Sequence, residues 1–70
     1  MPHMQISPSV IVVNLRCYYR VPNLGRVGHE FVDCNVINYE KSHTGRITTV
    51  VLESRMTNKF YTTVPCNLYF

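Results

Sequence analysis

The chain has 70 residues, of which 46% are hydrophobic and 16% charged, and its net charge is +3. A chain of this length buries only about 60% of the surface that it exposes when unfolded, so we expect these residues to form one domain. The hydrophobic fraction excludes a disordered chain. The charged fraction is low for a globular protein, so we expect part of the neutral surface to meet another molecule.

The N-terminal segment carries Pro2 and Pro8 and shows little hydrophobic periodicity. We therefore expect an extended lead-in over residues 1–9 and a single β-barrel domain over residues 10–70. The apolar run at residues 10–13 is far too short for a signal peptide or a membrane span, so no membrane partner is expected.

The cysteines are Cys17, Cys34 and Cys66. Their number is odd and no two have the C-x-x-C spacing, so neither a full disulfide framework nor a redox motif is indicated. A reduced, cytoplasmic setting is the simpler prediction.

Residues 11–21 alternate between apolar and polar with a period of two, which predicts a half-buried strand. Turn-forming residues at 22–28 then predict a loop. One face of this strand is expected to carry Ile11, Val13, Leu15, Cys17, Tyr19 and Val21, and the other Asn14, Arg16, Tyr18 and Arg20.

Three further strands are predicted, at residues 29–39, 46–53 and 60–64, and a final apolar segment follows at residues 68–70. No window of helical length has apolar residues at i, i+3 and i+4, so the fold is predicted to be all-β. Four to five short strands in this length suit a small SH3-like barrel or a strongly twisted antiparallel sheet.

The stretch Val64-Pro65-Cys66-Asn67-Leu68-Tyr69 resembles the V/I-P-x-N-Y segment that leads from the fourth strand of SH3 domains through a 3₁₀ turn into the last strand. Proline cannot continue a strand ladder, and Asn67 can bond local backbone and redirect the chain. The resemblance implies an SH3-like architecture. It also implies that Pro65, with Tyr69 or Leu68, would stand where that family lines a groove for proline-rich peptides.

Two features depart from the SH3 pattern. The chain has no tryptophan, and the loop at residues 22–28 is basic through Arg26 where the loop of the family is acidic. The acidic loop pairs with a basic residue of the peptide, so we carry over the architecture and not the proline-rich ligand.

No catalytic residue, metal site or cofactor is predicted. Cys34, Asp33 and the histidines supply residue types for nucleophilic catalysis, but they form no motif. Structural zinc sites usually contain two closely spaced ligand pairs, and the sequence has none. A barrel this small also has little room for a pocket that excludes water.

Arg16, Tyr18 and Arg20 would place two guanidinium groups around an aromatic ring on one strand face. Tyrosine and arginine are enriched in protein-binding hot spots, and the same arrangement can stack a base and hold phosphates. A solvated face, in which arginine stems cover the tyrosine, is the third interpretation. The predicted partner-binding residues are Arg16, Tyr18, Arg20, Arg26, Arg46 and Tyr69.

We rank a non-enzymatic protein-binding module ahead of a nucleic-acid-binding β-barrel, because +3 is a small charge for a dedicated nucleic-acid binder. An adaptor, a regulator, an inhibitor and a phage-type accessory protein all fit the first interpretation. A homodimer is an open variant, formed through an unprotected edge strand or through the apolar tail at residues 68–70.

Overall fold

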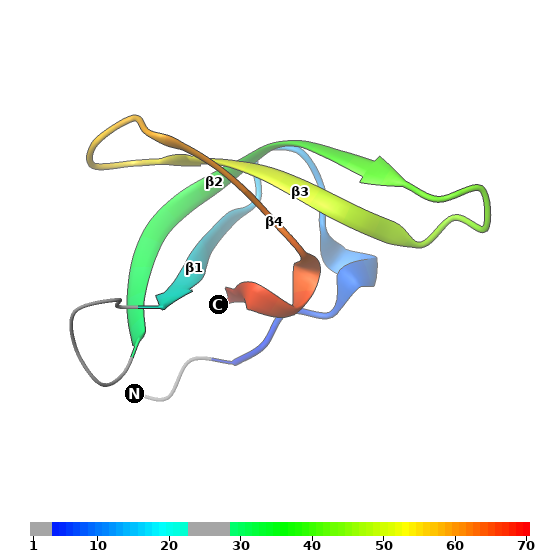
Figure 1. Ribbon diagram of the computed structural model, residues 1–70, viewed down its shortest axis with the longest axis horizontal. Coiled ribbons are helices and arrows are strands. Elements are labelled where there is room, and N and C mark those ends of the chain that lie inside the picture. The colour runs from blue at the N-terminus through cyan, green and yellow to red at the C-terminus, as the bar shows by residue number, and fades with distance from the viewer. Residues whose placement is uncertain (1–3, 23–28) are drawn as a thin grey trace.

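The computed structural model describes residues 4–22 and 29–70 (Figure 1). This part of the chain forms strands and two short 3₁₀ helices. In chain order they are η1 (Pro8–Val10), β1 (Arg16–Pro22), β2 (His29–Lys41), β3 (Ile47–Ser54), β4 (Phe60–Thr63), η2 (Pro65–Asn67) and β5 (Leu68–Tyr69).

The strands form one antiparallel sheet in the order β4-β3-β2-β1-β5, which confirms the all-β prediction. Among the described residues, β4 and β5 end the sheet and do not pair with each other, so the sheet is open and no closed barrel forms. Of the two predicted architectures, the twisted antiparallel sheet is therefore the correct one.

β2 is long and curved and joins the two halves of the sheet (Figure 1). Its first half pairs with β1 and its second half pairs with β3. The register against β3 shifts between Val36 and Asn38 and again between Glu40 and Lys41. Irregularities of this kind increase local twist, which lets one strand serve both halves. Beyond the second shift, the end of the β2–β3 hairpin projects away from the rest of the sheet (Figure 1).

The first strand is shorter than predicted, because it begins at Arg16 and not at Ile11. Asn14 has φ 75°, a left-handed conformation that asparagine tolerates better than most residues and that interrupts an extended strand. Its N–H donates to the carbonyl of Val36 at 2.7 Å, which holds the turn beside β2. Ile11 is buried as predicted, whereas Val13 is 50% exposed.

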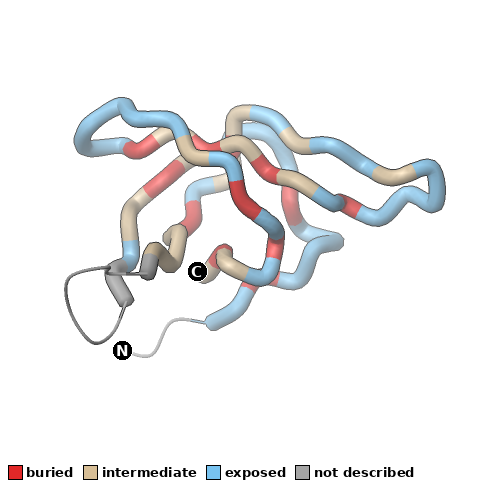
Figure 2. Tube along the Cα trace, viewed as in Figure 1, coloured by how far each residue is buried: buried red, intermediate tan, exposed pale blue. Residues whose placement is uncertain are grey.

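The core lies on the concave side of the curved sheet. Figure 2 shows buried positions where the strands curve over one another and mainly exposed positions toward the end of the β2–β3 hairpin. Ser54 is also buried, and its hydroxyl accepts from the N–H groups of Met56 and Thr57 at 3.3 Å. The buried hydrophobic residues are Ile6, Ile11, Cys17, Cys34, Val36, Ile47, Val50, Leu52 and Leu68.

Part of the N-terminal segment packs along the outer edge of β5. Gln5 forms an isolated bridge with Tyr69, and the N–H of Ile6 donates to the carbonyl of Leu68 at 3.0 Å. The N–H of Phe70 donates to the carbonyl of Met4 at 2.8 Å. Residues 4–6 therefore cover the backbone groups that β5 would otherwise expose, and the side chain of Ile6 is buried at 2% exposure.

The chain turns between β4 and β5 at η2, at the place where the sequence predicts a 3₁₀ turn. Pro65 is buried and begins the turn. The side-chain amide of Asn67 donates to the hydroxyl of Thr63 at 2.9 Å, and its backbone N–H donates to the carbonyl of Val64 at 3.1 Å. The side chain of Asn67 therefore bonds locally, but to a side-chain hydroxyl and not to the backbone as expected.

Candidate functional site

Arg16, Tyr18 and Arg20 lie on the face of β1 that points away from the core. The residue between the first two, Cys17, is 1% exposed, and Tyr19 packs against the buried cluster. Since side chains alternate along a strand, the three predicted residues share the opposite face.

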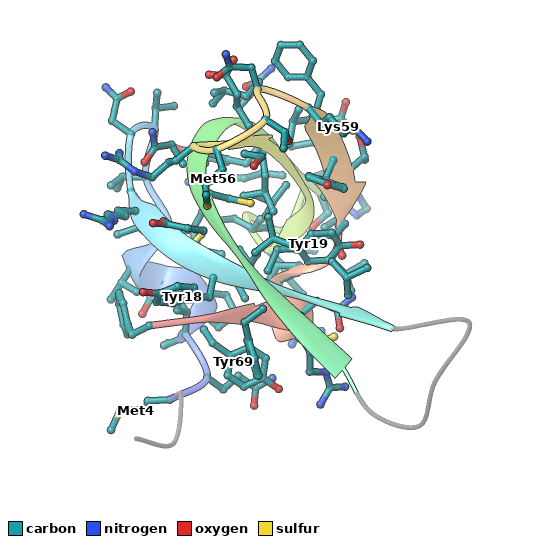
Figure 3. The ribbon with its side chains drawn as sticks, turned by 90° about the vertical axis from the view of Figure 1, so that its left-hand side faces the viewer. Met4, Tyr18, Tyr19, Met56, Lys59 and Tyr69 are labelled. Atoms are coloured by element: carbon teal, nitrogen blue, oxygen red, sulfur yellow. The ribbon has the colours of Figure 1, made fainter. Side chains whose placement is uncertain are left out.

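The register adds side chains from two neighbouring strands to this face. Tyr18 lies opposite Tyr69 of β5 on one side and opposite Asp33 of β2 on the other, and Arg20 lies opposite Phe31. Residues directly opposite in an antiparallel pair point to the same face. Figure 3 shows Tyr18 and Tyr69 on this side of the molecule, toward residue 4 and away from the β3–β4 turn.

One part of this outward face of the sheet is a polar cluster, defined as Arg16, Asp33, Asn35 and Arg55. Arg16 binds the carboxylate of Asp33 with two groups, Nη2 at 2.9 Å and Nε at 3.3 Å. Nε of Arg55 lies 3.9 Å from the same carboxylate, and its Nη1 donates to the side-chain oxygen of Asn35 at 3.3 Å. The hydrogen bond to Asp33, together with its charge, raises the pKa of Arg16 above its usual value. One carboxylate thus holds two guanidinium groups.

The other part is an aromatic–arginine face, defined as Tyr18, Arg20, Phe31 and Tyr69. The rings of Phe31 and Tyr69 meet edge to face, with centroids 5.4 Å apart and an interplanar angle of 87°. The guanidinium carbon of Arg20 lies 5.8 Å from the centre of the Tyr69 ring, within cation–π range. Phe31 is 39% exposed even though it makes these contacts. The face is therefore rich in aromatic side chains and partly open to solvent.

The other predicted basic residues do not extend this face. Arg46 precedes β3 at the far end of the β2–β3 hairpin, away from β1 (Figure 1). There it lines a separate open hollow of about 770 Å³ together with Ile11, Ile47 and Pro65. Arg26 lies outside the described residues.

The sequence analysis missed Phe31, Asp33, Asn35 and Arg55 as members of this surface. Asp33 and Asn35 alternate with Val32, Cys34 and Val36, and that pattern already indicated an outward direction. What it lacked was the register, which decides that Asp33 lies opposite Tyr18. No sequence signal indicated Arg55, because it reaches the cluster from the turn after β3.

Comparison of the chain with protein-family models, with curated proteins and with solved structures found no match. In the described part of the chain, no helix is long and apolar enough to cross a membrane.

Cys17 and Cys34 lie directly opposite each other across β1 and β2, and both are buried free thiols. Burial is the main cause that raises the pKa of each to about 11. The thiolate is the nucleophilic and metal-binding form of cysteine, and at neutral pH these two side chains stay protonated. Among the side chains that the structure describes, no three of histidine, cysteine, aspartate or glutamate gather closely enough to hold a metal ion.

The two buried thiols should make stability fall at high pH. The folded pKa of about 11 lies above the ordinary value of 9.0, so their contribution is complete below pH 9.0 and is lost as the pH rises through about 11. We expect a loss of about 1 kcal/mol for each thiol, reduced by solvent screening. Urea unfolding of wild type and Cys34→Ala, at neutral pH and at about pH 10.5, measures this loss in the free energy of unfolding. The stability gap between the two proteins should narrow at high pH, and a constant gap would contradict the prediction.

Proposed function

We propose that this chain is a non-enzymatic module that binds a protein partner through the aromatic–arginine face. The observation that carries the proposal is the convergence of Tyr18, Phe31, Tyr69 and Arg20 from three adjacent strands, with the rings of Phe31 and Tyr69 in contact and Arg20 over the Tyr69 ring. Clusters of tyrosine and arginine dominate the energetics of protein interfaces. An adaptor, a regulator, an inhibitor or an accessory protein would act through such a face.

Asp33 favours a protein partner over a nucleic acid. Its carboxylate already engages Arg16 and lies near Arg55, so two of the three guanidinium groups described on this side of the sheet already face a carboxylate. The carboxylate would also repel a nearby phosphate. The third group, Arg20, lies over the Tyr69 ring. A mixed-charge rim beside an aromatic patch is the usual composition of a protein interface.

The proposal includes an SH3-like arrangement of strands, in an open sheet and not a closed barrel, and a cytoplasmic setting. The 3₁₀ turn that leads from β4 into β5 supports the SH3-like arrangement. The free thiols of Cys17, Cys34 and Cys66 support a reducing compartment.

Affinity capture from a lysate of the source cell, quantified by mass spectrometry, tests the face. We expect Tyr18→Ala and Arg20→Ala each to reduce recovery of the specific partner about tenfold or more, as hot-spot truncations do. Arg46→Ala is the matched control, since it also removes an arginine but lies on the hairpin away from the face. Partners that both face variants retain would show that the interaction uses another surface.

The nucleic-acid alternative makes a separate prediction. A single-strand binder that uses Arg16 and Arg20 on phosphates would bind a labelled oligonucleotide at about 50 mM salt and release it steeply as salt rises. We expect wild type to show no measurable binding by fluorescence anisotropy. Salt-sensitive binding that disappears in Arg20→Ala would favour the alternative over the protein-binding proposal.

A further inference from the structure

The outer edge of β4 exposes backbone groups that the described part of the chain leaves without partners. The N–H of Ser54 donates to the carbonyl of Lys59, and Leu52 lies opposite Tyr61 and Val50 opposite Thr63. Hydrogen-bonded pairs alternate along an antiparallel ladder, so the backbone groups of Lys59, Tyr61 and Thr63 point toward β3. Those of the intervening residues Phe60 and Thr62 point outward.

The register on the other side of β3 agrees with this assignment. The N–H of Arg55 donates to the carbonyl of Asp33 in β2, so Arg55 and Glu53 direct their backbone groups toward β2. Ser54 and Leu52 must then direct theirs toward β4. Val64 continues the extended conformation with φ −103° and ψ 156°, and the exposed edge therefore runs from Phe60 to Val64.

Two other strand edges in the described part of the chain are protected. Residues 4–6 cover the edge of β5 through the bonds to Leu68 and Phe70. Along the projecting hairpin, the two register shifts interrupt β2, and the charged side chains of Lys41 and Arg46 flank its end. Irregular pairing and charge are the usual means by which proteins keep an edge from pairing with another chain.

The β4 edge has neither form of protection. No charged residue occurs from Phe60 to Val64, and Pro65 comes only after the strand. Phe60 and Val64 are 66% and 46% exposed, and Thr62 between them is also exposed. The strand is therefore uncharged, and it is open at the edge where the backbone groups of Phe60 and Thr62 point outward.

We propose that β4 pairs with β4 of a second copy of this chain, antiparallel and about a two-fold axis at Thr62. In this register Thr62 exchanges hydrogen bonds with Thr62 of the second copy, and the N–H of Val64 donates to the carbonyl of Phe60 at both ends. These are about four backbone bonds, because the carbonyl of Val64 already accepts from Asn67. The outward side chains then form Phe–Val and Thr–Thr cross-strand pairs, which are both favourable. A two-fold axis makes the contact self-complementary and closed.

The absence of charge selects a second copy over an arbitrary peptide. Lys59 falls at opposite ends of the paired strands, so no like charges face each other across the axis. A contact between short edge strands buries less than the roughly 1,200 Å² of a standard interface, so the dimer should be weak and concentration-dependent. The inference is independent of the aromatic–arginine face, which lies on β1, β2 and β5.

Sedimentation velocity from about 10 μM to about 1 mM tests the contact. Wild type is expected to shift from the monomer mass toward twice that mass. Thr62→Lys and Thr62→Glu each place like charges opposite each other at the axis, and each should stay monomeric at every concentration. An equimolar mixture of the two variants places opposite charges there and should restore the dimer.

The mixture also controls for folding, because a variant that is merely unfolded cannot recover the dimer mass. Thr48→Lys is a matched control, since it adds the same charge at an exposed position of β3 beyond the span of β4, and it should dimerise as wild type does. The proposal is overturned if wild type stays monomeric, if Thr62→Lys dimerises as wild type does, or if the mixture stays monomeric.

Discussion

Leu52→Ala is expected to destabilise the protein by about 3 kcal/mol, because it removes a fully buried side chain and leaves a cavity. Leu52 is 0% exposed and lies opposite Val36 on one side and Tyr61 on the other, at the centre of the sheet. A chain of this length has a free energy of unfolding of roughly 4 to 10 kcal/mol. The substitution should therefore remove a large part of the total stability.

Urea denaturation followed by circular dichroism measures this loss as a lower midpoint with an unchanged slope. Leu52→Met nearly conserves volume and should cost less than about 1.5 kcal/mol. If Leu52→Ala cost no more than Leu52→Met, the centre of the core would lie elsewhere.

Ile6→Ala is expected to cost about 2 to 4 kcal/mol, although Ile6 lies in a segment with little sequence periodicity. Its side chain is 2% exposed, and its N–H donates to Leu68. The loss should loosen residues 4–6 from β5 and expose the edge that they cover. Because β5 also carries Tyr69, the aromatic–arginine face should become less rigid.

Two measurements together test the role of Ile6. Urea denaturation gives the loss of stability, and amide hydrogen exchange should be faster at Ile6 and at Phe70, whose N–H groups hold the segment to β5. Val12→Ala is the matched control, because Val12 is 53% exposed and its truncation should change stability by less than about 0.5 kcal/mol. Unchanged exchange at Phe70 would mean that residues 4–6 do not depend on the burial of Ile6.

The face and the edge lie on different parts of the sheet, and this separation has a functional consequence. The aromatic–arginine face is built on β1, β2 and β5, whereas the proposed dimer contact uses β4 at the other end of the strand order. A dimer would present two copies of the face. Two linked sites raise the apparent affinity for a partner that is itself multivalent, without any new contact.

The strands from β2 onward were predictable because their signals are local. β-branched and aromatic residues set them, and glycine and proline interrupt them at turns such as that near Gly45, where φ is 85°. The start of β1 was not predictable from alternation alone. The alternation of apolar and polar residues already begins at Ile11, but the left-handed conformation of Asn14 interrupts the extended backbone. A hydrogen bond from Asn14 to Val36, which is distant in sequence, holds this conformation.

The sequence by itself determined which side chains of β1 share a face, because the period of two is a property of the strand alone. It therefore brought Arg16, Tyr18 and Arg20 together. Only the tertiary structure decided what lies beside them. The pairing of β1 with β2 and β5 places Asp33 against Arg16 and the Tyr69 ring beneath Arg20, and the strand order leaves β4 with an open edge. Such neighbours depend on register between segments far apart in the chain, and register is set by the burial of one whole face of the sheet at once.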